Sequence, residues 1–261
     1  MLDAATALGE PSAPLEPSAT AEKWRKGLPA LRNEAVAIPA ELKRILPPIC
    51  TALAEGGAGD SAFHIGEAIA SGDIDADSLL RVSLARNQKA IRTSALHMGF
   101  SPDLVWLIGE LASAPLANAL QQGALGPGTG MHANAWNRGY CPFCGSWPVF
   151  IEAGIDAYTL RCSYCALEWA LASRRCVYCA NDGSDFVTAA IDVRAPERRV
   201  ELCGRCSSYT KVIGVSGATP FPLLAILDLA TMNLDQGAMS RGYRRPELFD
   251  LDAIEPRSNA C

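Results

Sequence analysis

The stretch CPFCGSWPVFIEAGIDAYTLRCSYC runs from Cys141 to Cys165 and decides how this part of the chain folds. It begins and ends with a CxxC motif. A second stretch of the same design, CVYCANDGSDFVTAAIDVRAPERRVELCGRC, runs from Cys176 to Cys206, so eight of the ten cysteines fall in four CxxC motifs. These motifs, the first to fourth knuckles, are Cys141 and Cys144, Cys162 and Cys165, Cys176 and Cys179, and Cys203 and Cys206.

The CxxC spacing favours metal binding. Two intervening residues allow one tight turn to direct both thiolates at a single ion, and the backbone N–H groups of the turn can donate hydrogen bonds to the sulfurs. Two such turns complete a tetrahedral site of four sulfurs, which suits zinc or iron. Gly145 follows the first knuckle and suits the positive φ angle that such a turn often requires. The other knuckles are followed by Ala166, Ala180 and Ser207.

The two stretches form an internal repeat. The first and third knuckles are 35 positions apart and the second and fourth are 41 apart, so the second copy has six extra residues. The loops 145–161 and 180–202 suit β-hairpins that each bring two knuckles together. We therefore predict two metal sites with knuckles paired in chain order. Site 1 contains Cys141, Cys144, Cys162 and Cys165, and site 2 contains Cys176, Cys179, Cys203 and Cys206. Because each repeat is too small to fold by apolar burial alone, its ion is expected to supply much of its stability.

Other interpretations of the cysteines are less well founded. Disulfides would require an oxidising compartment, and redox-active CxxC pairs of the thioredoxin type would require a βαβ pattern that the sequence lacks. The pattern does not separate zinc from iron, and it supports a structural role for the ions as well as a redox role. Cys50 lies in an apolar helical segment and is expected to be a small core residue.

The rest of the chain changes character at several points. The first 20 residues are rich in Ala, Pro and Ser, and residues 123–130 contain four glycines and a proline. The pattern predicts an α+β protein with these parts: a disordered tail (1–21), a helical domain (22–122), a linker (123–139), a first metal domain (140–174), a second metal domain (175–216), a C-terminal helix that packs on the helical domain (217–245) and a tail (246–261).

Five helices are predicted in the helical domain. They are expected at 22–37, 40–54, 61–70, 77–98 and 102–121. Ser101 and Pro102 provide an N-cap and a proline at the first helical position, and apolar residues recur at helical spacing after them. A last helix is predicted from Phe221 to about Met239, in which Asp228 and Asp235 argue against a membrane span.

Composition excludes several classes of function. The chain has 261 residues, 49% of them apolar, and a formal charge of −5, which leaves no basic excess for nucleic acid. It has no apolar run of the roughly 18 residues that a membrane helix needs and no recognisable export signal, so a cytoplasmic location is expected. None of the three histidines is assigned a role. No catalytic constellation stands out, and we predict that the protein is not an enzyme.

Several motifs in combination resemble the formate dehydrogenase accessory protein FdhE family. They are WNRGYCPFCGSWPV (136–149), LRCSYCALEW (160–169), CVYCAN (176–181), ELCGRCSSYTKVI (201–213) and LDLATMNLD (227–235). The resemblance covers residues 136–245 well and the helical part loosely. It implies a helical domain followed by two rubredoxin-like metal domains, with iron as the usual metal. It also implies a cytoplasmic accessory protein that binds the catalytic subunit of a respiratory, molybdenum-containing formate dehydrogenase before export and is needed for its activity.

The family's metal ligands fall on the eight knuckle cysteines, and the CxxC most tied to its function falls on Cys141 and Cys144. This chain departs from the family in its short N-terminal part and in the segment TPFPLLAILDLAT (219–231), where an acidic stretch is expected. Two alternatives stay open on the residues alone. One is a zinc-ribbon module for protein interactions in another pathway, and the other is a rubredoxin-like electron-transfer protein.

Overall fold

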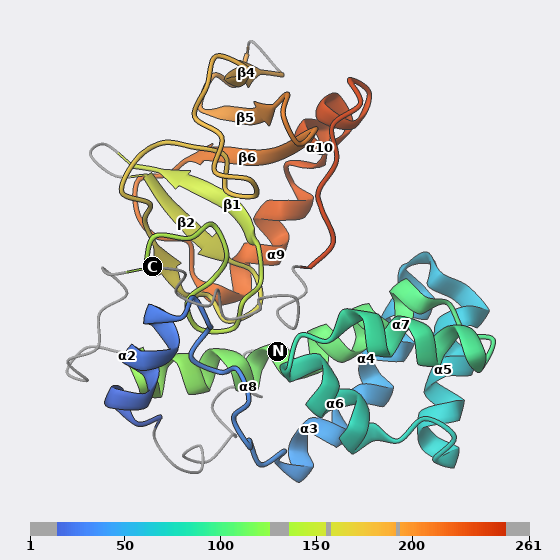
Figure 1. Ribbon diagram of the computed structural model, residues 1–261. Helices are drawn as coiled ribbons and strands as arrows, with labels where there is room; N and C mark the ends of the chain where they lie inside the picture. Colours follow the sequence, from blue (N-terminus) through green and yellow to red (C-terminus); the bar gives the residue numbers. More distant parts are fainter. Residues whose placement is uncertain (1–14, 126–135, 155–157, 192–193, 249–261) are drawn as a thin grey trace. The chain divides into compact units, whose positions relative to one another are not determined.

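The computed structural model describes residues 15–125, 136–154, 158–191 and 194–248 (Figure 1). These residues form two compact units. The helical unit contains residues 31–125. The sheet unit contains residues 15–30 and the described residues from 136 onward.

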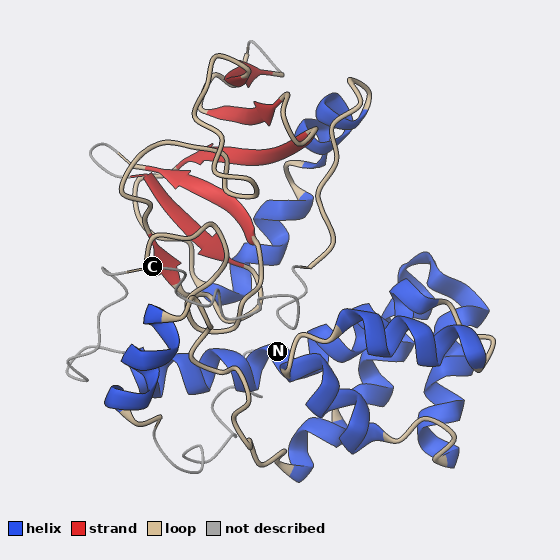
Figure 2. Ribbon diagram, viewed as in Figure 1, coloured by secondary structure: helices blue, strands red, loops and turns tan. Residues whose placement is uncertain are grey.

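The helical unit is built from short helices around one long helix (Figure 2). They are α3 (Ala40–Arg44), α4 (Leu46–Leu53), the π-helical turn η1 (Ala54–Ala58), α5 (Gly59–Ser71), α6 (Ala76–Leu84), α7 (Gln88–His97) and α8 (Pro102–Leu125). Asp75 and Asn87 cap α6 and α7, because each side chain accepts a hydrogen bond from a backbone N–H in the first turn. The predicted helical character of this region is present, although the predicted boundaries shift.

Two predicted helices are each broken in two. Segment 40–54 divides into α3 and α4, because Pro47 and Pro48 favour the start of a new helix. Segment 77–98 divides at Arg86, whose φ angle is 58°. The buried Arg86 guanidinium lies 2.5 Å from the Glu110 carboxylate and 4.7 Å from the centre of the Trp106 ring, so contacts with α8 hold the break in place. Helical periodicity does not show such a tertiary contact.

The sheet unit is organised around one sheet of six strands. They are β1 (Pro148–Ala153), β2 (Tyr158–Cys162), β3 (Glu168–Trp169), β4 (Phe186–Ala190), β5 (Arg198–Cys203) and β6 (Ser208–Gly214), in the order β3-β2-β1-β6-β5-β4. Each repeat contributes three antiparallel strands. The repeats join where β1 pairs in parallel with β6, with Ile151 opposite Val212. The two predicted metal domains therefore share a single sheet (Figure 1).

The C-terminal helical segment packs on this sheet. It forms two helices, α9 (Phe221–Leu229) and α10 (Met232–Met239), rather than one. Leu224, Leu234 and Ala238 are buried in one core with residues of β1, β5 and β6. This segment was predicted to pack on the helical domain; the structure shows its buried apolar side chains in the core of the sheet unit.

Helix α2 (Pro17–Arg25) also belongs to the sheet unit. The Trp24 indole N–H donates a hydrogen bond to the carbonyl of Pro142 (2.9 Å), and the Ala30 N–H donates to the same oxygen (2.8 Å). The predicted disordered tail is thus corrected for residues 17–21, which are helical. The predicted helix at 22–37 is replaced by one that ends at Arg25. Residues 1–14 lie outside the described residues.

The α+β class predicted from the sequence is confirmed, with a helical N-terminal region and two four-cysteine groups in a sheet region. Most of the predicted linker and of the last tail, including residues 126–135 and 249–261, lies outside the described residues. Among the described helices, none is long and apolar enough to cross a membrane.

Candidate metal centres

The four knuckles share one backbone geometry. In the first three, the N–H of the first cysteine donates a hydrogen bond to the carbonyl five residues later, and in the fourth these two positions face each other across β5 and β6. The pairs are Cys141 with Ser146, Cys162 with Leu167, Cys176 with Asn181, and Cys203 with Ser208. Each turn is thus closed by backbone contacts that fix where its sulfurs point.

The residue after every knuckle has a left-handed backbone. The φ angles are 85° at Gly145, 62° at Ala166, 59° at Ala180 and 52° at Ser207. A residue with a Cβ atom pays about 1–2 kcal/mol for this conformation, so three of the four turns hold strained residues. The sequence predicted a positive φ angle only at Gly145, because glycine is the one residue of the four that readily adopts it.

Substitutions at these positions are expected to differ in their effect on stability. Gly145→Ala should lower the free energy of unfolding of the sheet unit by about 1 kcal/mol, because it adds a Cβ at a positive φ angle. Ala180→Gly should leave it unchanged or raise it by up to about 1 kcal/mol, since relief of strain offsets the entropy of glycine. Denaturant titrations of metal-loaded protein measure both. Ala172→Gly is the control, because Ala172 is exposed and lacks a positive φ angle. If Ala180→Gly lowers the free energy of unfolding as much as the control does, Ala180 is not strained.

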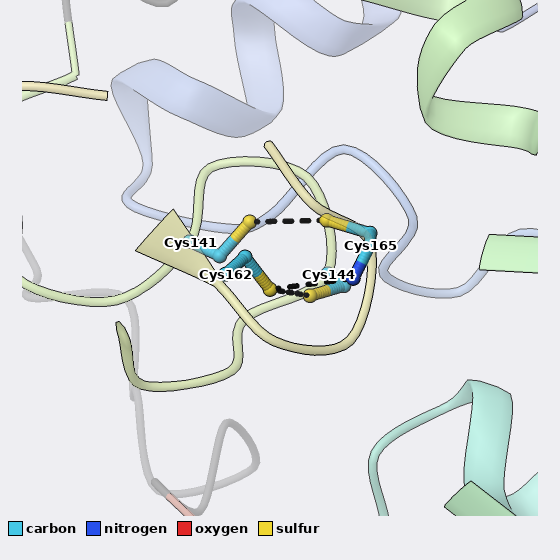
Figure 3. Close-up of side chains that lie close together, drawn as sticks. All are labelled: Cys141, Cys144, Cys162 and Cys165. Carbon is cyan, nitrogen blue, oxygen red and sulfur yellow. Dashed lines mark hydrogen bonds between the residues drawn. The ribbon is translucent and has the colours of Figure 1, made fainter. Parts of the chain in front are cut away.

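Group 1 comprises the sulfurs of the first and second knuckles (Figure 3). All four sulfurs lie within 4.8 Å of one another. The Sγ atoms of Cys141 and Cys165 are 3.6 Å apart, and those of Cys144 and Cys162 are 3.5 Å apart. The first cysteine of one knuckle therefore faces the second cysteine of the other.

Group 2 repeats this arrangement in the third and fourth knuckles. Its four sulfurs also lie within 4.8 Å of one another. The Sγ atoms of Cys176 and Cys206 are 3.7 Å apart, and those of Cys179 and Cys203 are 3.6 Å apart. Both groups contain the cysteines that the sequence pairs in chain order, whereas Cys50 lies in α4 of the helical unit, in neither group.

The spacing of the sulfurs suits a tetrahedral ion. Metal–sulfur bonds of about 2.3 Å place tetrahedral sulfurs about 3.8 Å apart, close to the distances in both groups, whereas a disulfide requires about 2.05 Å. The nine described cysteines are all free thiols. Each group could therefore hold one metal ion through four thiolates.

The cysteines of group 1 are so deeply buried that they can be thiolates only if a cation is bound. All four cysteines of group 1 are buried, and this burial raises the pKa of the Cys141 and Cys165 thiols well above their usual range. Thiolates in such surroundings need a cation to compensate the lost solvation. The chemistry of the donors therefore fits a divalent or trivalent metal.

Group 2 is more open to solvent. Cys179 and Cys206 are half-buried, whereas Cys176 and Cys203 are buried. Burial raises the pKa of Cys176. At Cys203 burial acts in the same direction and is the largest single cause, but hydrogen bonds from the backbone N–H of Cys206, the Asn181 amide and the Cys179 and Cys206 thiols together outweigh it and lower the pKa to about 7. The two groups thus have the same type of ligand and the same sulfur spacing, but group 2 is more accessible to solvent.

Hydrogen bonds to sulfur support both groups. The Cys165 N–H donates to the sulfur of Cys162 (3.5 Å), and the Asn181 amide donates to the sulfur of Cys203 (3.5 Å). The Ser146 hydroxyl lies 3.3 Å from the sulfur of Cys144. Sequence reasoning did not assign a role to Asn181 or Ser146. Their place directly after the knuckle turns is the signal that could have identified them.

Curated sequences resemble this chain over part of its length. An FdhE homologue of Shewanella oneidensis is 33% identical over 111 residues, which cover 40% of this chain and 35% of that protein. One from Pectobacterium carotovorum is 29% identical over 159 residues, covering 58% and 49%, and the FdhE protein of Escherichia coli is 28% identical over 148 residues, covering 55% and 45%. The matches thus span less than half the length of these relatives. No family model matches the chain.

The fold and the two sulfur groups define a cysteine-knuckle protein that has two candidate metal centres in its sheet unit and a separate helical unit. The crystal structure of the FdhE protein from Pseudomonas aeruginosa shares this fold, with a TM-score of 0.56 at 22% identity over 94% of this chain and 83% of that one. Together with the matched sequences, this likeness confirms the predicted resemblance to the FdhE family.

Proposed function

We propose that the protein is an accessory factor for a formate dehydrogenase and works by binding rather than by catalysis. The observation that carries this proposal is the pair of four-sulfur groups in a fold similar to that of FdhE. The proposed client is the catalytic subunit of a molybdenum-containing formate dehydrogenase, bound in the cytoplasm before export. The client is the one that the family resemblance implies.

The eight knuckle cysteines are the proposed ligands, with group 1 and group 2 holding one ion each. Iron is favoured and zinc is the alternative. Iron held by four thiolates would supply one-electron redox chemistry, whereas zinc held in the same way would supply only structural support. The chain's own contribution is to fix the four sulfurs by hairpins and to donate hydrogen bonds to them from Cys165 and Asn181.

The proposal is tested in a strain that lacks the gene and any second copy. Respiratory formate oxidation should be lost and should return with the wild-type gene. The double variant Cys141→Ser, Cys144→Ser should fail to restore it, because group 1 loses half of its ligands. Purified wild-type protein should contain two metal ions per chain by elemental analysis. The catalytic subunit should co-purify with it.

The matched control is Cys50→Ala, which removes a buried cysteine outside both groups and should restore activity. Full formate oxidation in the deletion strain would overturn the accessory role. If zinc-loaded protein supports activity as well as iron-loaded protein does, the ions serve the fold alone. Two zinc ions together with an unaffected formate dehydrogenase would favour the zinc-ribbon alternative.

A further inference from the structure

The first and third knuckles lie against each other within the sheet unit. The two backbones come close at Gly139, two residues before Cys141. A Cβ atom at this position would lie 1.6 Å from the carbonyl oxygen of Val177, which follows Cys176. Only a residue without a side chain allows the two backbones to come so close. The backbone just before the first knuckle thus packs directly against the backbone of the third knuckle.

A series of aromatic rings crosses the same boundary. Tyr140 precedes Cys141, Trp147 follows the first knuckle turn, and Tyr178 lies inside the third knuckle. The ring centres of Tyr140 and Trp147 are 5.9 Å apart, and those of Trp147 and Tyr178 are 5.0 Å apart, both in edge-to-face geometry. Such pairs contribute about 0.5–1.5 kcal/mol each beyond the area that they bury.

Hydrogen bonds add to this boundary. The Arg175 guanidinium donates to both the backbone carbonyl and the side-chain oxygen of Asn137, each at 2.8 Å. The Tyr178 hydroxyl donates to the carbonyl of Tyr209 in β6 (3.1 Å). The third knuckle is thereby tied to the segment before the first knuckle on one side and to the sheet on the other.

From these contacts we infer that the two centres load with metal cooperatively, with Gly139, Trp147 and Tyr178 as positioning residues. An ion in group 1 fixes the first knuckle turn and with it Gly139 and Trp147. These residues then hold Val177 and Tyr178, so the third knuckle loses less conformational entropy when group 2 binds its own ion. By thermodynamic reciprocity, an ion in group 2 favours group 1 by the same factor. The inference rests on the proposed metal binding by both groups.

The coupling is measured by titrating reduced, metal-free protein with Co²⁺, whose thiolate complexes absorb visible light. The variants Cys176→Ser, Cys179→Ser and Cys141→Ser, Cys144→Ser give the affinity of each remaining group alone. The product of the two association constants of the wild-type protein, divided by the product of these single-group constants, is the coupling factor. We expect about 5- to 150-fold, the usual range for energetic coupling between sites. A factor within twofold of one overturns the inference.

The route of coupling is tested with Gly139→Ala. The added methyl group must push Val177 away, so the coupling factor should fall toward one while both groups still bind Co²⁺. Trp147→Leu should lower it as well, because it removes the ring contact without changing the backbone contact. The control is Gly217→Ala, since Gly217 has open space around it and lacks a positive φ angle. An unchanged factor in Gly139→Ala would show that coupling runs through the sheet instead.

A measurement on the wild-type protein alone guards against variants that fail to fold. With one equivalent of Co²⁺, native mass spectrometry should show metal-free and two-metal chains, with one-metal chains well below the half or more expected for independent sites. A one-metal population as large as the two single-group affinities predict for independent sites contradicts cooperative loading. If no more than one ion binds at saturation, the proposed second centre itself fails, which is a separate result.

Discussion

Removal of the metal ions by a chelator is expected to unfold the sheet unit and leave the helical unit folded. Binding of a structural ion by four cysteines provides about 10–16 kcal/mol, which matches or exceeds the 5–15 kcal/mol of net stability of a typical domain. Both sulfur groups lie in the sheet unit, whereas α3 to α8 belong to the other compact unit. Loss of the ions should therefore act on one unit only.

Hydrogen exchange resolves this result by segment. In stripped, reduced protein, protection should disappear from the six strands and from α9 and α10, whose apolar residues complete the core of the sheet. It should also disappear from α2, which is tied to the carbonyl of Pro142 in the first knuckle. Protection in α8 should persist, and circular dichroism should retain most of the helical signal.

Reloading with Zn²⁺ is the control, because restored protection shows that the chelator acted through the ions. Equal loss of protection in α8 would mean that the two compact units unfold as one. Full protection of β1 and β6 in stripped protein would mean that apolar burial alone holds the sheet, and the ions would then have no structural role.

The sequence was sufficient to predict the two cysteine groups because their geometry is local. Two residues between cysteines form one turn, and the 35-residue repeat indicates which turns share a hairpin. The α+β class followed from the change between helical and strand patterns along the chain. Each of these features depends on a sequence pattern that extends over only a few tens of residues.

The features that were missed depend on contacts between distant segments. The parallel pairing of β1 with β6 joins residues about 60 positions apart and leaves no local pattern. The helical structure of residues 17–21, predicted as part of a disordered tail, was missed because composition alone does not show that Trp24 of the same helix bonds to Pro142. The break at Arg86 was missed for the same reason, since its partners lie in α8.

The α9–α10 segment contains the clearest example of a role that the sequence concealed. Asp228 and Asp235 were noted only because they argue against a membrane span. In the structure both carboxylates contact the ammonium group of Lys211 in β6, at 2.5 Å and 2.8 Å, and Lys211 is completely buried. The Arg245 guanidinium lies 3.0 Å from Asp228 and 3.1 Å from Asp235. Two positive and two negative charges thus balance between the sheet and the two helices.

Lys211→Met is expected to lower the free energy of unfolding of the sheet unit by about 3 kcal/mol or more, because removal of one member of a buried ion pair typically costs 3–5 kcal/mol. Arg245 can compensate one of the two carboxylates, so the lower end of this range applies. Denaturant titration followed by tryptophan fluorescence in excess Zn²⁺ measures the change. This signal reports mainly on the sheet unit, which contains four of the five tryptophans: Trp24, Trp136, Trp147 and Trp169.

Two comparisons separate buried charge from loss of a lysine. Lys26→Met removes an exposed lysine at the C-terminal end of α2 that is paired with Glu22, and exposed pairs contribute about 0–1 kcal/mol. The double variant Lys211→Met, Asp235→Leu removes one charge of each sign and should recover part of the loss, because Arg245 and Asp228 remain as a balanced pair. If Lys211→Met costs no more than Lys26→Met, the charges do not hold α9 and α10 on the sheet. If the double variant is less stable than Lys211→Met alone, Asp235 stabilises the segment through its hydrogen bond from the Tyr209 hydroxyl (2.7 Å) rather than through its charge.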